Sequence, residues 1–327
     1  MSALSTLGLR GPARVAIRQH RLAMWTAGAL ALAVIVSLVG THVWVASVSD
    51  SFADSGCSVE KTVRGCGVTV RHFLSAELHF KRLLGYAQLL MTLLPAFIGI
   101  FVAGPMIGRE LESGTYRLSW TQSFSPARWL AAKLAVPAVL TLAGVGVLSA
   151  VCSWARSRTG RTHYPIDSYD RLAYGSMGTV PVGYALCMLA LGALAGLLLR
   201  RTVMAMVVTV IGYGALATAL NAVRNGLWPT VNTTFGLGTD PKLPEGTVSV
   251  ASGWLTADGR RLPENACLRW GVDLKQCLAD NHVTQRYVDH HPTSHFWPLQ
   301  LVETGILLAL AALAVAIAFR VLRRAHG

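Results

Sequence analysis

The stretch LAYGSMGTVPVGYALCMLALGALAGLLLRRTVMAMVVTVIGYGALATALNAV, residues 172–223, contains only two charged side chains, the adjacent Arg200 and Arg201. On each side of this pair lies an apolar run of at least the roughly 20 residues that a helix needs to cross a bilayer. Backbone polar groups in lipid must be satisfied within the spanning structure, which favours helices. The stretch therefore predicts two membrane-spanning helices joined by a tight turn.

Four further apolar runs meet the same criterion. The chain has 327 residues, of which 53% are hydrophobic and 14% charged, whereas soluble domains have roughly 25% charged residues. We therefore expect an all-α integral membrane protein with six transmembrane helices. The first run is longer than the roughly 7–15-residue core of a secretory signal, so we interpret it as an uncleaved anchor. The six expected spans are Leu22–Val48, Leu83–Ala103, Leu134–Trp154, Leu172–Leu199, Thr202–Val223 and Phe296–Phe319.

Cationic residues are unevenly distributed among the connecting segments. Segments 1–21 and 104–133, the Arg200–Arg201 turn and the tail after Phe319 are short and rich in Arg and Lys. The other loops are longer and nearly balanced in charge. The positive-inside rule places the first set, with both termini, in the cytoplasm of a cell whose plasma membrane the chain crosses. Only 5 of the 29 cationic residues are lysine, and this arginine bias suggests a bacterial genome. The net charge of +13 then reflects membrane placement and gives no reason to expect a nucleic-acid partner.

The cysteines support the same orientation. Two of the six lie inside expected spans, where a thiol behaves as a small apolar group. The other four fall in the loops placed outside, as two close pairs: Cys57 with Cys66, and Cys267 with Cys277. An oxidising compartment permits such pairs to form disulfides. We therefore expect two disulfides, with free thiols as the alternative.

The spans divide the chain into four parts. A basic N-terminal segment, 1–21, precedes helices one to five in 22–223, and the last helix and a basic tail occupy 296–327. The loop 224–295 is too long for a bare linker, so we expect a small folded cap on the outer side. The first outer loop, 49–82, should return to the membrane as a helix. The run 191–196, LGALAG, has small residues at the spacing that permits close helix packing, against this chain or a second copy.

The inner loop 104–133 carries the functional prediction. Residues 108–134 read GRELESGTYRLSWTQSFSPARWLAAKL. Gly114 can adopt the left-handed conformation that ends a helix, and Ser125 followed by Pro126 is a typical N-cap and first helical residue. We therefore expect a short helix, a break and a second helix that enters the third span. A charged, capped loop on the inner face suits the docking of another protein, with an ordinary membrane-surface turn as the alternative.

This loop resembles the one after the second span in permease subunits of ABC-type exporters of the type-two class, and most closely those of its actinobacterial branch. Residues 120–123 (WTQS) and 295–305 (HFWPLQLVETG) resemble the same branch. The topology is similar throughout, while the motifs cover about forty residues. The two loop patterns, R-E-x-E-S-G-T and R-W-L-x-x-K-L, are carried by Arg109, Glu110, Glu112, Ser113, Gly114 and Thr115, and by Arg128, Trp129, Leu130, Lys133 and Leu134.

The resemblance implies a function and partners. In such exporters this loop holds a coupling helix that sits in a cleft of a separate ABC ATPase subunit, and two permease halves enclose the pathway. It implies that residues 109–115 contact the ATPase and that a second permease copy or a relative is required. The chain contains no G-x-x-x-x-G-K-[ST] phosphate loop, so ATP would be bound by the partner and this chain would hold no cofactor of its own.

Other polar residues suggest competing functions. Glu303 is the only acidic or basic residue within the expected spans, and intramembrane carboxylates are functional candidates. The alternative is a water-reachable carboxylate hydrogen-bonded to neighbours such as Thr304 or Gln300. Residues 289–295 (DHHPTSH) resemble a metal-ligand cluster, but Pro292 interrupts helical pairing of the histidines, so no metal site is expected. A membrane-embedded enzyme that uses these residues, or a membrane sensor with the 224–295 cap as receptor, remains an alternative to the permease.

Overall fold

A computed structural model describes most of the chain, in two compact units. The first unit contains Met1–Ile166, Arg171–Thr218 and Thr304–Gly327, and the second contains Asp167–Asp170 and Ala219–Glu303. Residues 1–20 and 115–124, with Thr115 of the predicted contact, lie outside the described residues. The described ranges are 21–61, 64–114, 125–160, 162–239, 242–267 and 273–324.

Six helices are long and apolar enough to cross a membrane, as the sequence predicted. The second of them is the longest, because α3 continues through a π-helical turn, η1, into α4 without a break. The helices that make up these six spans are α2 (Arg21–Asp54), α3 (Gly67–Phe97) with η1 (Ile98–Ala103) and α4 (Gly104–Ser113), α6 (Pro126–Ser157), α8 (Val180–Leu199), α9 (Thr202–Val223) and α11 (Phe296–Arg324). One further short helix, α7 (Arg171–Ser176), precedes α8.

The helix ends follow from local sequence. Gly114 ends α4 in the left-handed conformation, with φ of 74°, and the Ser125 hydroxyl accepts a hydrogen bond from the Arg128 amide at the start of α6. Both predicted signals are confirmed. The turn between α8 and α9 is made by Arg200, which has a φ of 50°. A side chain in this conformation is uncommon outside glycine, and here it closes the tight turn that the sequence predicted.

The first expected outer loop is mostly helical, which confirms the predicted helical return. The continuous helix from Gly67 to Ser113 has 47 residues and is therefore about 70 Å long, more than twice the thickness of a bilayer core. Both α2 and α3 extend beyond their apolar runs, and the Cys57–Cys66 disulfide joins the ends of the hairpin that they form. The π-turn begins three residues after Pro95, whose missing amide hydrogen already weakens the regular pattern there.

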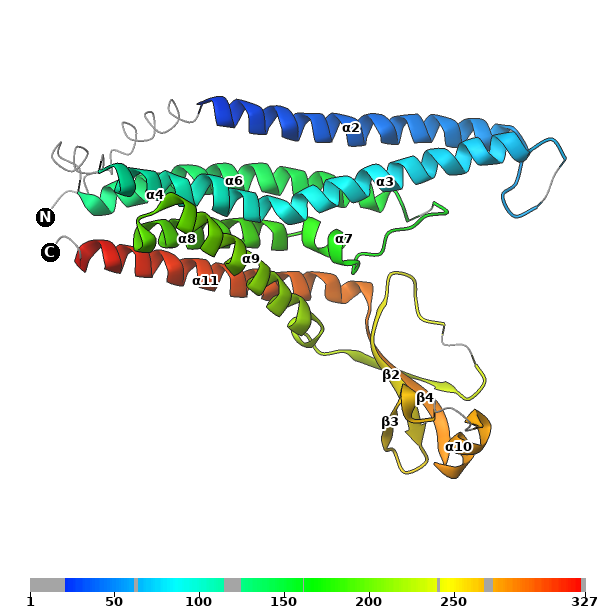
Figure 1. Cartoon of the computed structure of the whole chain (residues 1–327). Helices are drawn as coiled ribbons and strands as arrows, with labels where there is room; N and C mark the ends of the chain where they lie inside the picture. The colour runs from blue at the N-terminus through cyan, green and yellow to red at the C-terminus, as the bar shows by residue number, and fades with distance from the viewer. Residues whose placement is uncertain are drawn as a thin grey trace, which may run out of the picture. The chain divides into compact units, whose positions relative to one another are not determined.

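Helix α8 is the most buried of the six candidate spans. It packs on α3, η1, α4 and α6 within the first unit, whose helices run side by side in Figure 1. The small residues of the 191–196 run make this packing possible. A Cβ on Gly192 would lie 2.6 Å from the Gly99 carbonyl oxygen, and one on Gly196 would lie 3.0 Å from that of Gly104. The close neighbour of this small-residue face is therefore in the same chain.

The second unit contains a four-stranded antiparallel sheet, so the all-α expectation was wrong for residues 224–295. The strands are arranged in the order β1–β4–β2–β3. Strands β2 and β4 are rich in Val, Thr and aromatic residues, which favour a half-buried pleated surface. This segment is folded, and the Cys267–Cys277 disulfide links a 3₁₀ turn to α10 (Leu274–Asp280). The strand bounds are β1 (Val231–Gly236), β2 (Val248–Thr256), β3 (Arg261–Pro263) and β4 (Val283–His291).

Candidate functional site

The predicted contact segment lies where α4, the start of α6 and the α8–α9 turn meet, all within the first unit. Helix α4 passes directly against the turn at Gly108. A Cβ at this glycine would lie 3.2 Å from Thr202 Cα and 3.4 Å from its amide nitrogen. The absence of a side chain at Gly108 therefore lets the last turn and a half of α4 reach the first residue of α9.

Glu110 joins α4 to α6. Its Oε2 accepts a hydrogen bond from the indole Nε1 of Trp129 at 3.1 Å. Its Oε1 forms an ion pair with the ammonium group of Lys133. Trp129 and Lys133 are four residues apart on one face of α6, so a single carboxylate can reach both. The side chains of Glu110 and Lys133 are 23% and 14% exposed, so this pair is screened less than one on the open surface.

Glu112 joins α4 to α9. Its Oε2 accepts two hydrogen bonds from Thr202, from the backbone amide at 3.1 Å and from the hydroxyl at 2.9 Å. Thr202 is the first residue of α9, so its amide has no partner within that helix. The carboxylate also lies at the positive end of the α9 dipole. Glu112 thus caps a helix that begins ninety residues later in the chain.

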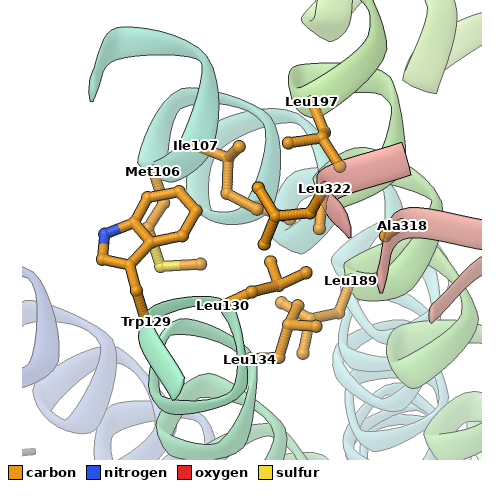
Figure 2. Packing of buried hydrophobic residues seen from close by; sticks show 11 residues of the cluster. Met106, Ile107, Trp129, Leu130, Leu134, Leu189, Leu197, Ala318 and Leu322 are labelled. Atoms are coloured by element: carbon orange, nitrogen blue, oxygen red, sulfur yellow. The ribbon is translucent and has the colours of Figure 1, made fainter. Parts of the chain in front are cut away.

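An apolar cluster packs α4 and α6 together with α8 and α11 (Figure 2). Ile107 and Leu130 are fully buried in it, and the Trp129 indole that binds Glu110 is 7% exposed. Because such close-packed interiors deform little, the ends of these helices are held together as one block. Side chains come from four helices: Met106 and Ile107 from α4, Trp129, Leu130 and Leu134 from α6, Leu189 and Leu197 from α8, and Ala318 and Leu322 from α11.

The remaining predicted residues of this segment are placed differently. Arg109 is exposed. The Ser113 hydroxyl lies 3.5 Å from the Glu110 carbonyl oxygen, at the limit of a hydrogen bond, and Gly114 supplies the left-handed helix end. Sequence reasoning missed the role of Thr202, since nothing near the Arg200–Arg201 turn indicates a partner so far away in the chain.

Glu303 forms an ion pair with Arg224, both in the second unit. The carboxylate is fully buried and receives Arg224 Nε at 3.0 Å and Nη2 at 3.3 Å. The guanidinium also donates from Nη1 to Asn221 Oδ1 at 3.3 Å. The hydroxyl of the neighbouring Thr304 lies 2.8 Å from that of Thr179. A buried two-point pair of this kind holds the end of α9 to α11, which is a structural role.

The histidines at the end of β4 come closer together than expected. Pro292 was expected to prevent pairing of His291 with His295, yet a 3₁₀ turn over Thr293–His295 brings their Nδ1 atoms to 3.1 Å. His291 Nε2 lies 3.0 Å from the Asn225 carbonyl oxygen, to which it must donate, so its Nδ1 accepts from His295. In the described part of the chain, no group of three His, Cys, Asp or Glu side chains has the geometry to hold a metal ion.

Two polar side chains near this histidine pair, Tyr169 and Asp289, form hydrogen bonds within the second unit. The Tyr169 hydroxyl donates to the Pro292 carbonyl oxygen at 2.7 Å. Burial raises the pKa of Tyr169 to about 12, so this phenol is a neutral donor at neutral pH. Asp289 faces the sheet surface instead, where Arg261 and Asn232 bind it at 2.8 Å and 2.7 Å. The polar side chains of residues 289–295 therefore belong to separate hydrogen-bond networks.

Comparison with known protein families supports this region as a unit. A family model described as ABC-2 membrane transporter related matches residues 21–224, which include every residue of the α4, α6 and α9 contacts. No curated protein matches the chain, and no solved structure does.

Proposed function

We propose, from the premise that this chain belongs to the ABC-2 membrane transporter-related family, that it is the permease subunit of an ATP-driven exporter. In this proposal the chain forms one half of a translocation pathway and pairs with a second copy or a related permease. Hydrolysis takes place on a separate ABC ATPase subunit. The family assignment supports a permease, while the export direction and the coupling site are our inference.

One observation carries the coupling proposal: α4 is tied to both of its neighbours by carboxylates. Glu110 binds the start of α6, and Glu112 binds the start of α9. A force that an ATPase applies to the exposed end of α4 would therefore act on three spans at once. Arg109, which is exposed next to these carboxylates, is available for the partner itself.

The first test is stimulation of an ATPase. The ABC ATPase encoded nearest to this chain in its genome should co-purify with it from membranes, and the complex in proteoliposomes should hydrolyse ATP at least several-fold faster than the ATPase alone. The control is the same ATPase with an unrelated six-span protein. An ATPase that neither binds nor responds to this chain would count against the permease assignment.

The second test addresses orientation, since the proposal requires α4 to face the cytoplasm. A cysteine in place of Arg109 should react with a membrane-impermeant maleimide only after cells are permeabilised. A cysteine in place of Asp258, an exposed residue after β2, should react in intact cells. Both native free cysteines, Cys152 and Cys187, are buried and should give little background. Labelling of the Arg109→Cys variant in intact cells would exclude coupling at this site.

A further inference from the structure

An open pocket lies between α2 and α3, in the hairpin that carries the Cys57–Cys66 disulfide, at least ten residues inside each helix from the end that the disulfide joins. It has a volume of about 260 Å³ and is lined by Gly40, Thr41, Trp44 and His79. The indole of Trp44 meets the His79 ring edge-on, with centroids 6.2 Å apart. Gly40 leaves the floor open, since a Cβ there would meet no atom within 4 Å. The pocket is therefore bounded by one imidazole, one indole and one hydroxyl.

The pocket opens onto one exposed face of α3, which we call the α3 stripe. Its residues recur every three or four positions and so lie above one another on the helix. Its composition changes along the helix from cationic, through tyrosine, to apolar. Tyr86 is 65% and Phe97 50% exposed, while Leu84 on the opposite face is fully buried. The stripe consists of His79, Arg82, Tyr86, Leu89, Leu93 and Phe97.

The change in composition coincides with the membrane boundary. The apolar run of α2 ends at Val48, four residues after Trp44, and that of α3 begins at Leu83, four residues after His79. Trp44 and Tyr86 have the amphipathic rings that concentrate at the headgroup level of a bilayer. Arg82 therefore lies at the depth of lipid phosphates, and the leucines below it lie at the depth of acyl chains.

Side-chain direction brings the polar groups of the stripe together. Helical side chains lean towards the N-terminus of their helix, onto the residues three and four positions earlier. Arg82 thus leans towards His79 and the mouth of the pocket. The only described acid on α3, Glu77, lies on the buried face, where its Oε2 binds His163 at 3.1 Å. The stripe therefore offers hydrogen-bond donors and a cation, and the described residues of α3 place no carboxylate on it.

We propose that this pocket and the α3 stripe bind one anionic phospholipid from the leaflet on the disulfide side. His79 and Arg82 donate hydrogen bonds to its phosphate, and Trp44 packs against its glycerol backbone. One acyl chain lies along the apolar part of the stripe. Arginine suits this role because its planar guanidinium matches the oxygens of a phosphate. This binding needs no ATPase and is independent of the proposed transport function.

The test is lipid binding to the delipidated full chain, followed by native mass spectrometry with dioleoyl phosphatidylglycerol and dioleoyl phosphatidylcholine. We expect one phosphatidylglycerol molecule to bind at concentrations at which phosphatidylcholine does not. Arg82→Gln should weaken this binding about tenfold or more, because a charge-assisted hydrogen bond is lost. Gly40→Leu should weaken it similarly, by placing a side chain in the pocket from a position where a Cβ meets no atom within 4 Å.

Two matched controls separate the site from general effects. Gly28→Leu changes a glycine of the same helix that also has no atom near its Cβ, and Arg71→Gln removes an exposed arginine three turns away on α3. Both should bind as the unmodified protein does. Equal binding of the two lipids, or unchanged binding by Arg82→Gln, would overturn the proposal. So would displacement of the lipid by millimolar inorganic phosphate, which would indicate a free anion site instead.

Discussion

Replacement of both Glu110 and Glu112 by alanine is expected to reduce ATPase stimulation to the level of the ATPase alone, while the protein still inserts with six spans. The Glu110 carboxylate holds the Trp129 indole and the Lys133 ammonium group, and Glu112 holds the first amide of α9. Without them α4 remains a helix, because its backbone bonds are unchanged. Only the apolar packing then joins α4 to its neighbours, without the polar contacts to α6 and α9, so its movement is passed to those spans poorly.

The measurement must distinguish loss of coupling from loss of binding. Rates of ATP hydrolysis should therefore be compared with the amount of ATPase that co-purifies with each variant. Since Arg109 remains, we expect the ATPase to stay bound while its stimulation is lost. Glu110→Gln should keep part of the stimulation, because an amide oxygen still accepts from the Trp129 indole but no longer pairs with Lys133.

A matched control comes from two exposed acids of the second unit. Glu245 and Asp258 are exposed, and their joint replacement by alanine removes the same charge without touching α4. This variant should stimulate the ATPase as the unmodified chain does. Wild-type stimulation by the Glu110→Ala, Glu112→Ala variant would falsify the assignment of these two residues to coupling.

Substitution of Gly192 by alanine is expected to destabilise the helix bundle by about 1–3 kcal/mol, the usual cost of overpacking a filled core. The new Cβ would lie 2.6 Å from the Gly99 carbonyl oxygen and 3.0 Å from the Ala103 Cβ. The first of these atoms belongs to the backbone of η1, which cannot move aside without displacing the helix. Helix α8 would have to shift away from η1, and the contact that leads into α4 would loosen.

The sign of this effect is informative, because alanine is a better helix former than glycine by about 1 kcal/mol. At Gly144 in α6, where a Cβ meets no atom within 4 Å, the same substitution should be neutral or slightly stabilising. Thermal unfolding in detergent of Gly192→Ala and Gly144→Ala, side by side, tests this. A Gly192→Ala protein as stable as Gly144→Ala would mean that α8 and η1 are further apart than the structure has them.

The helices of this protein could be predicted because their signals are local. Each apolar run must form its own backbone hydrogen bonds in lipid, so length and hydropathy suffice to identify the six spans. Ser125 and Gly114 mark helix ends through bonds and dihedral angles within a few residues of themselves. The two disulfides were predictable for a similar reason, since their cysteines are only nine and ten positions apart.

The sheet of the second unit was harder to predict from the sequence. Strand β4 pairs with β1 and β2, which lie some thirty to sixty residues earlier in the chain. Pairing over such distances leaves no periodic signal as strong as that of a membrane span. The run DHHPTSH resembles a set of metal ligands, and we judged the pairing of its histidines by helical spacing. In the structure, the end of a strand and a 3₁₀ turn determine the positions of these histidines.

The sequence by itself determined that the chain spans a membrane with six helices, where those helices end and which loop resembles a coupling loop. It also identified Glu110, Glu112 and Glu303 as candidate functional carboxylates. Only the tertiary structure decided their partners, Lys133 with Trp129, Thr202 and Arg224. The physical reason is range: hydropathy and capping act within one helix, whereas a side chain finds its partner only after separate helices have packed.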